Sequence, residues 1–239
     1  MNKVISFFAA IVLTISSYSQ DSTNFKISAD IVSRFVWRGQ YPGGSFAHIQ
    51  PLLYYSKCNF EIGAWGTYAI SGEYKEVDLY VKYYIKDFSI TATNYYMPVF
   101  ADGSVSSFNT KFYNFNSKTT ANQIELALQY KNSGNFPIGI LVGTFIYGND
   151  HNYGYKLEND DKNYYSTYIE LNYTTKNSDI FIGMTPKEGF YGNTWGVINI
   201  GVKGRKNIKI SNNFSIPVFA SLVTNPQAES IYAVFGLTL

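Results

Sequence analysis

Apolar and polar residues alternate at a period of two in the stretch NFKISADIVSRFVWRG, residues 24–39. Ile27 and Ile31 fall on one parity, and Arg34 and Arg38 fall on the other. This period predicts a β-strand with one apolar face and one polar face. In a soluble sandwich the apolar face is buried, whereas in an outer-membrane barrel it meets lipid and the polar face lines the lumen.

The same alternation recurs along the rest of the chain, mostly in segments near the length that a tilted strand needs to cross a bilayer. These segments are 47–56, 60–70, 76–85, 88–97, 123–130, 136–147, 164–174, 180–185, 197–210, 214–224 and 230–239. Helical periodicity is absent. The pattern therefore predicts an all-β protein, an antiparallel transmembrane β-barrel of about twelve strands.

The connections between these segments alternate in length. Tight turns such as KCN, KD, KNSGN and SNN are rich in Gly, Asn, Asp and Lys. Between them lie mostly longer pieces, among them GQYPGGS, the stretch 99–121, GNDHNYGYKLENDDKN and KEGFYGNTWG. Segregation of this kind predicts short periplasmic turns and longer extracellular loops, with both termini on the periplasmic side.

Aromatic residues of the apolar parity flank the short turns. Tyr55 and Phe60 bracket one turn, and Tyr83 and Phe88 bracket the next. The same positions beside later turns are held by Tyr130, Phe136, Tyr173 and Phe214. These rings predict an aromatic girdle at a membrane interface. A second, looser girdle near the other ends of the strands is predicted from Phe35, Trp37, Tyr68 and Tyr165. The alternative is cross-strand aromatic pairing in a soluble sheet.

The first residues, MNKVISFFAAIVLTISSYSQ, have one lysine, an apolar run and small residues before Gln20. They predict a secretory signal peptide over 1–19 and a single domain over 20–239, exported to the cell outer membrane of a Gram-negative bacterium. At the other end the apolar alternation continues to Leu239, in the manner of barrels that the assembly machinery recognises. The expected partners are therefore outer-membrane lipid and the barrel-assembly machinery.

Composition supports this interpretation. Aromatic residues make up 18% of the chain and charged residues only 15%, whereas average usage is nearer a quarter charged. The 19 basic and 17 acidic residues nearly balance, which gives no electrostatic reason to expect a nucleic-acid partner. A single cysteine, Cys58, forms no internal disulfide.

The polar parity supplies the candidate functional residues. Those predicted to line the lumen are Lys26, Asp30, Arg34, Arg38, Glu76, Asp78, Lys82, Glu125, Glu170 and Lys203. We expect Arg34 and Arg38, near the outer mouth, to oppose Glu76 and Asp78 in a transverse field that selects small polar solutes. The alternative is a salt-bridged interior with a purely structural role.

Enzymatic chemistry is not predicted. The two histidines, His48 and His151, have no nucleophile elbow or metal-ligand spacing around them. His48 shares the polar parity with Gln50 and is expected to form hydrogen bonds in the lumen. The acidic loop with Glu158, Asp160 and Asp161 lacks the spaced ligands of a calcium loop. No catalytic residue, cofactor or metal site is therefore expected.

Several blocks together resemble the TorF-like porins, a family of Gram-negative outer-membrane proteins. They are ADIVSRFVWRGQ, IQPLLYYS, FEIGAWGTYA, EVDLYVKYYI and the closing SIPVFASLVTNPQAESIYAVFGLTL. The resemblance spans most of the mature chain and implies an outer-membrane β-barrel with a channel role. The final Leu239 departs from the Phe that most often ends such barrels.

The predicted function is a porin-like channel for the passive passage of small polar solutes, without a cofactor. One alternative is a non-conducting barrel that serves as a structural or adhesive surface protein. The other is a secreted, soluble β protein that binds a hydrophobic ligand.

Overall fold

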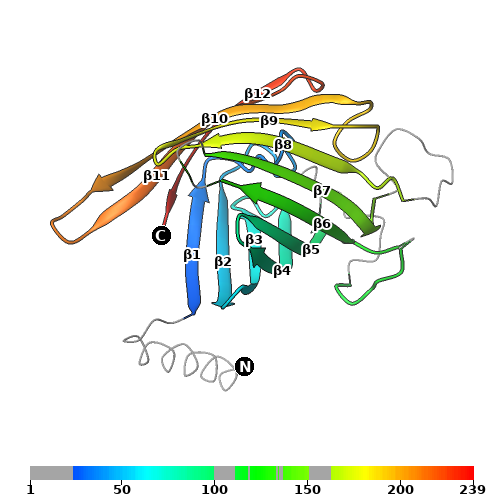
Figure 1. Ribbon diagram of the computed structural model, residues 1–239, viewed down its shortest axis with the longest axis horizontal. Coiled ribbons are helices and arrows are strands. Elements are labelled where there is room, and N and C mark those ends of the chain that lie inside the picture. The colour runs from blue at the N-terminus through cyan, green and yellow to red at the C-terminus, as the bar shows by residue number, and fades with distance from the viewer. Residues whose placement is uncertain (1–23, 100–110, 118, 133, 135–136, 151–162) are drawn as a thin grey trace.

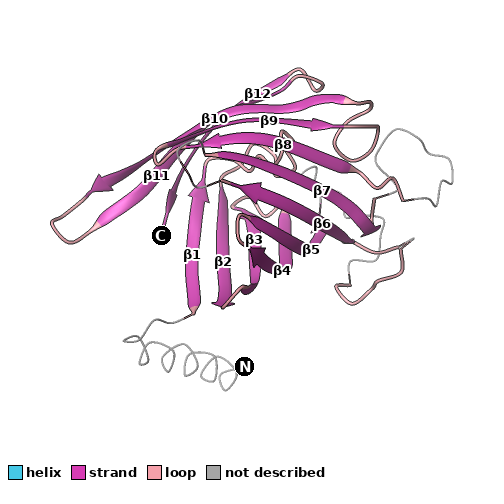
Figure 2. Ribbon diagram, viewed as in Figure 1, coloured by secondary structure: helices cyan, strands magenta, loops and turns pink. Residues whose placement is uncertain are grey.

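The structure is a computed structural model that describes residues 24–99, 111–117, 119–132, 134, 137–150 and 163–239. Within these residues the chain forms twelve antiparallel strands (Figure 1, Figure 2). The strands are β1 (Phe25–Val32), β2 (His48–Lys57), β3 (Phe60–Ala69), β4 (Lys75–Ile85), β5 (Phe88–Val99), β6 (Asn122–Lys131), β7 (Ile138–Gly148), β8 (Thr167–Thr174), β9 (Ser178–Thr185), β10 (Gly196–Lys209), β11 (Ser215–Asn225) and β12 (Ser230–Thr238). None of the described residues belongs to a helix with the length and hydropathy that a membrane span needs. The predicted fold class and strand number are confirmed, while the predicted signal peptide lies outside the described residues.

The sheet closes on itself. Each strand pairs with its neighbours in sequence, and β12 returns to pair with β1. Closure gives every strand a neighbour on both sides, so that the backbone N–H and C=O groups along the wall bond within the protein. The last junction is short, because only Asp30–Val32 of β1 and Gly236–Thr238 of β12 are in register, whereas β1 and β2 share eight residue pairs. We call the β1–β12 junction the seam.

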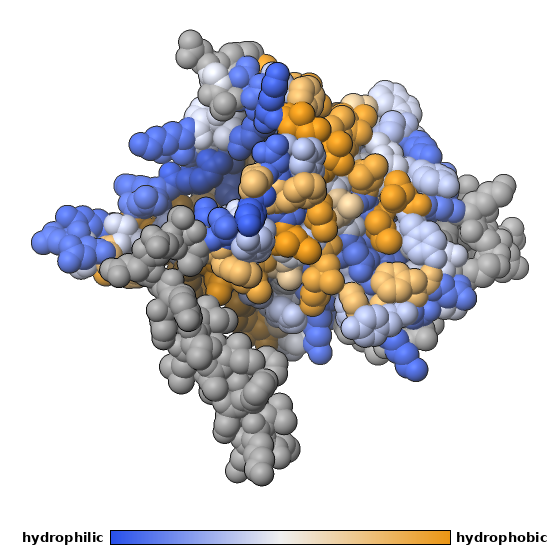
Figure 3. Space-filling model, turned by 60° about the horizontal axis from the view of Figure 1, so that its bottom comes forward, coloured by the Kyte–Doolittle hydropathy of each residue, from blue (hydrophilic) through white to orange (hydrophobic). Residues whose placement is uncertain are grey.

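The alternation sorts side chains onto two faces, as predicted. On the outer surface Ile27, Leu79 and Leu126 keep 74%, 42% and 46% of their area exposed. Glu125, the neighbour of Leu126 on β6, is only 1% exposed because its side chain points to the interior. Apolar side chains gather over the middle of the face seen in Figure 3, with hydrophilic ones towards its margins. The apolar parity therefore forms the outside of the barrel.

Tight turns join the strands at one end of the barrel, and β1 begins and β12 ends on this same side. Aromatic rings pair on the outer surface beside these turns, with centroids 4.6–5.0 Å apart. The pairs are Phe25–Tyr55, Phe60–Tyr83 and Phe88–Tyr130. The exposed Tyr173 and Phe214 lie next to later turns, whereas Phe136 lies outside the described residues. For these rings the predicted row beside the short turns is confirmed.

The second predicted girdle is wrong in part. Tyr68 and Tyr165 are exposed, but Phe35 is buried and Trp37 is half-buried among interior rings. The reason is that β1 ends at Val32, so the period-two pattern beyond it does not describe a strand. The chain then turns into the barrel, which carries the next apolar residues inward instead of out to the surface.

Candidate functional site: the barrel interior

A tight turn at residues 37–40, sequence WRGQ, projects from the β1–β2 connection into the barrel. Trp37 and Gln40 exchange two backbone hydrogen bonds of 2.9 and 2.8 Å. Arg38 and Gly39 between them have φ values of 51° and 74°, the positive pair that a two-residue type I′ turn requires. Gly39 is also constrained by space, because a Cβ there would lie 1.9 Å from the carbonyl oxygen of Ile198 on β10. The turn places Arg38 at its tip.

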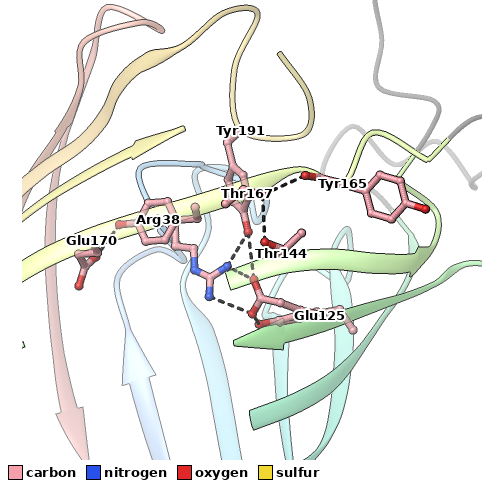
Figure 4. A network of polar contacts seen from close by, with 9 residues as sticks. Arg38, Glu125, Thr144, Tyr165, Thr167, Glu170 and Tyr191 are labelled. Atoms are coloured by element: carbon pink, nitrogen blue, oxygen red, sulfur yellow. Dashed lines mark hydrogen bonds and ion pairs between the residues drawn. The ribbon is translucent and has the colours of Figure 1, made fainter. Parts of the chain in front are cut away.

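The Arg38 guanidinium reaches the opposite wall of the barrel (Figure 4). It forms a two-pronged ion pair with Glu125 of β6, in which Nη2 donates to Oε2 at 3.0 Å and Nη1 donates to Oε1. Nη1 also donates to the hydroxyl oxygen of Tyr191 at 2.5 Å, and the Tyr95 hydroxyl donates to Glu125 Oε2 at 3.0 Å. The side chains of the pair are 10% and 2% exposed. Removal of either partner would therefore leave an uncompensated buried charge.

A second tight turn, from Gly189 to Gly192 in the β9–β10 connection, enters the barrel beside the first. Its ends exchange backbone hydrogen bonds of 3.0 and 3.3 Å, and its tip carries Phe190 and Tyr191. The Tyr191 ring stacks on Phe145 of β7 at 5.8 Å with an interplanar angle of 10°. Together with other buried side chains they form an interior cluster of Tyr95, Phe145, Tyr168, Tyr191 and Ile198, against which Trp37 and Phe190 pack. We call the end of the interior beside the long connections the loop half; this aromatic cluster fills it.

The predicted opposition of Arg34 and Arg38 to Glu76 and Asp78 is not what the structure shows. Arg38 pairs with Glu125, and Arg34 lies over the ring of Tyr41 at 5.7 Å. Glu76 instead accepts a hydrogen bond of 2.7 Å from the Tyr74 hydroxyl, beside the β3–β4 turn. The pairing depends on how far the turn at residues 37–40 reaches across the barrel, which strand parity does not encode.

The expected role of His48 as an interior hydrogen-bonding residue is confirmed. Its ring is fully buried, and Nδ1 lies 2.9 Å from Thr67 Oγ1 while Nε2 lies 2.9 Å from the Gly43 carbonyl oxygen. Both nitrogens are thus occupied by structural partners. Within the described residues, no group of three or more His, Cys, Asp or Glu side chains is arranged to hold a metal ion. His151 and the acidic loop with Glu158, Asp160 and Asp161 lie outside the described residues.

The other end of the interior, beside the short turns, has a different character. We call it the turn half. Glu61 accepts hydrogen bonds of 2.9 Å from the hydroxyls of Tyr80 and Tyr84, and Arg205 of β10 forms an ion pair with Asp179 of β9. A cavity of 390 Å³ opens here between β1, the β8–β9 turn and β10–β12. No comparable aromatic cluster fills this half among the described residues.

The ten residues predicted to line the lumen spread over both halves. Glu76, Asp78 and Glu125 are buried. The Arg38 side chain is only 10% exposed. The half-buried residues are Asp30, Arg34, Lys82, Glu170 and Lys203, while Lys26 is exposed. Arg38 and Glu125 are brought together directly, and a side-chain hydrogen bond joins Glu76 and Asp78. Their roles in transport stay predictions.

Sequence reasoning missed the aromatic residues that fill the loop half. Phe145 and Leu141 share the inward parity of β7. Two apolar side chains on a face predicted to be polar could have indicated an apolar cluster in the interior. The Arg-Gly pair within WRGQ was a second signal, because Gly supplies positive φ in tight turns. Tyr191 gave no signal, since the long connection around it has no periodicity.

A buried carboxyl group lies beyond the strands at the loop end. Asp150 follows β7 and accepts hydrogen bonds from Ser166, 2.8 Å from the backbone N and 2.6 Å from Oγ. Ser166 Oγ in turn accepts a 2.8 Å hydrogen bond from the Phe190 N–H. Burial raises the pKa of Asp150 from 3.8 to about 6, against the opposing effect of the Ser166 hydrogen bonds. This carboxyl group therefore connects the β7–β8 connection to the turn that carries Tyr191.

Comparison with known proteins found a likeness at the level of structure. No protein-family model matches the chain and no curated protein matches it, so the resemblance to TorF-like porins is not confirmed. Among solved structures, the COG4313 outer membrane channel from Pseudomonas putida F1 aligns over 92% of this chain and 95% of that chain. The identity is 11% and the TM-score is 0.39. A likeness this distant carries no conclusion about function, which rests on the residues of this chain.

Proposed function

We propose that this protein is a β-barrel of the Gram-negative outer membrane that forms a narrow channel for small polar solutes, closed at rest by the two turns in its loop half. The single observation that carries the proposal is the distribution of side chains across the wall. Apolar residues cover the outside, while the inside holds Arg38, Glu125, Lys203 and Arg205. Lipid solvates an apolar exterior of this kind, and water or polar solutes solvate a charged interior.

A soluble protein that carries a hydrophobic ligand is disfavoured by the same distribution. Its apolar residues would line an internal pocket, and its exterior would be polar. Here large apolar side chains such as Leu53, Leu128, Ile182 and Leu222 are exposed around the barrel. Soluble monomers rarely expose apolar patches of this extent.

The closure in the loop half consists of connections and not of wall. The turns at residues 37–40 and 189–192 hydrogen-bond within themselves, and Arg38 and Tyr191 contact Glu125 and Phe145 of the wall. One further hydrogen bond to the wall runs from Asn225 Nδ2 to the Gly39 carbonyl oxygen. Their withdrawal would leave the strand pairing intact. Barrels of eight strands are filled by their own side chains and barrels of sixteen hold aqueous channels, so twelve strands leave room for a pore once an insert moves.

The alternative of a non-conducting structural barrel is supported by one specific observation. The ion pair and the aromatic cluster together resemble a packed core more than a loosely held gate. The two proposals differ in whether those turns ever leave the interior.

Recordings in planar bilayers separate the two. We expect the wild-type protein to give small, infrequent conductance steps, and Arg38→Ser to raise the open probability because the ion pair with Glu125 is lost. The matched control is Lys187→Ser, an exposed cation on the same connection as Tyr191. Folding is checked by heat modifiability on gels. Silence of both wild type and Arg38→Ser, with folding intact, would favour the structural barrel.

A further inference from the structure

The 390 Å³ cavity in the turn half carries more positive than negative charge. Lys203 and Arg205 point into it from the inward parity of β10, and Lys176 lies at its edge in the β8–β9 turn. Asp30 is the one acidic residue in this lining, and Asp179, the partner of Arg205, lies beside it. Three positive charges against two negative ones leave one positive charge without compensation. We call this space the basic cavity.

Lys203 is the cation that most needs a partner. Its side chain is half-buried on β10, and Nζ lies 4.0 Å from the centre of the Phe219 ring on β11. It makes no ion pair with any described residue. Asp30, on the facing strand, accepts a 2.6 Å hydrogen bond from Thr238 Oγ1. The carboxylates of Asp30 and Asp179 lie near this half-buried ammonium group without forming an ion pair with it, so an anion that enters the cavity would stabilise it further.

We propose that the basic cavity binds a small phosphate-type anion, such as inorganic phosphate or a phosphate monoester. A phosphate group carries a charge of roughly −1.5 to −2 at neutral pH and three strong acceptor oxygens, which suit a lining with three cations. Lysine binds phosphate as a point charge, and the guanidinium N–H groups of Arg205 that do not face Asp179 are further donors. The volume falls within the range of about 300–1,000 Å³ that is typical of small-molecule sites.

This inference rests on the proposed channel function, since it names the class of solute that the channel would carry. The basic cavity also borders the seam, with Asp30 on β1 and Thr238 on β12 in its lining. A phospholipid headgroup is therefore a second source of phosphate. A phosphodiester headgroup has one negative charge and fewer free oxygens than a phosphate monoester, so we expect the free anion to bind more tightly.

Isothermal titration of the full-length protein in lipid-free micelles with inorganic phosphate tests the site. We expect one saturable site, weakened about tenfold or more by Lys203→Gln and retained by Lys203→Arg. The matched control is Lys131→Gln, an exposed cation at the end of β6 that does not line the cavity. Binding that is unchanged in a folded Lys203→Gln variant would overturn the proposal.

A second arm identifies the source of the phosphate. Native mass spectrometry of the same variants with phosphatidylglycerol reports whether a headgroup is retained through Lys203. Retention of this lipid that depends on Lys203, with no binding of inorganic phosphate, would overturn the assignment of a free solute. Neither experiment depends on conduction. A protein that binds phosphate through Lys203 but never conducts would therefore overturn the channel proposal and leave the phosphate site standing.

Discussion

The two halves of the barrel interior are built on the same alternating strands and yet are opposites. In the loop half, Arg38 and Glu125 are enclosed by aromatic rings and almost fully buried. In the turn half, Arg205 and Asp179 form the corresponding ion pair beside an open cavity, with 36% and 18% of their side-chain area exposed. The strands of the wall do not determine which half is closed. The β1–β2 and β9–β10 connections close the loop half because their turns fold into the barrel.

The largest effect is expected from the enclosed ion pair. Glu125→Ala leaves the Arg38 charge buried without a partner, so we expect the free energy of unfolding to fall by about 3–5 kcal/mol. The double variant Arg38→Met with Glu125→Leu removes both charges and should recover most of that loss. Urea unfolding in micelles, followed by tryptophan fluorescence, measures all of them. A double variant as unstable as Glu125→Ala would show that the charge itself is not the cause.

Both halves of the barrel share one exterior that we propose faces lipid, and the Leu79→Arg variant tests this orientation. This outward position on β4 would place a charge in hydrocarbon, at a cost of about 2–4 kcal/mol near the bilayer middle. Lys82→Ala, three residues along the same strand but on the inward parity, should have a much smaller effect. Folding into lipid vesicles, scored by heat modifiability, gives both values. Equal defects would contradict the assignment of faces.

A pH dependence is expected at the loop end of the barrel. Since the folded-state pKa of Asp150 is about 6 and its ordinary value is 3.8, the folded state holds the proton more tightly. Stability therefore decreases as the pH rises from about 4 to about 6, by about 2–3 kcal/mol in total. Asp150→Asn keeps an acceptor for Ser166 and should remove this part of the pH dependence. The measurement is urea unfolding of wild type and variant at pH 4 and pH 7. If the free energy of unfolding changes equally with pH in both proteins, Asp150 is not the group responsible.

The smallest effect is expected in the turn half. Arg205→Gln breaks an ion pair that is partly exposed, so the free energy of unfolding should fall by less than about 1 kcal/mol. The same urea assay compares the loss of unfolding free energy in this variant with the loss in Glu125→Ala. A loss as large as that of Glu125→Ala would mean that the turn half is as tightly closed as the loop half.

The wall could be predicted from the sequence because its information is local. Alternation within each segment predicts the strand and its apolar face. The short connections predict which strands pair with one another. The outward positions of Ile27 and Leu79 follow from parity alone. Aromatic pairs such as Phe60 with Tyr83 follow from parity together with the length of a hairpin.

The interior could be predicted only in part. Arg38 does face inward, but at the tip of a turn and not from a strand, so its partner follows from the reach of residues 37–40. Glu125 and Tyr191 are brought to it by stretches far away in the sequence, through the closure of the barrel and the fold of the β9–β10 connection. Contacts of this kind depend on the strand stagger around the ring, which no single segment encodes.

The seam has a consequence for how the barrel opens. The amides of Ala29 and Ser33 donate across it to Leu239 and Phe235. Few rungs hold the first and last strands together, so deuterium uptake should begin there before it reaches the longer ladders.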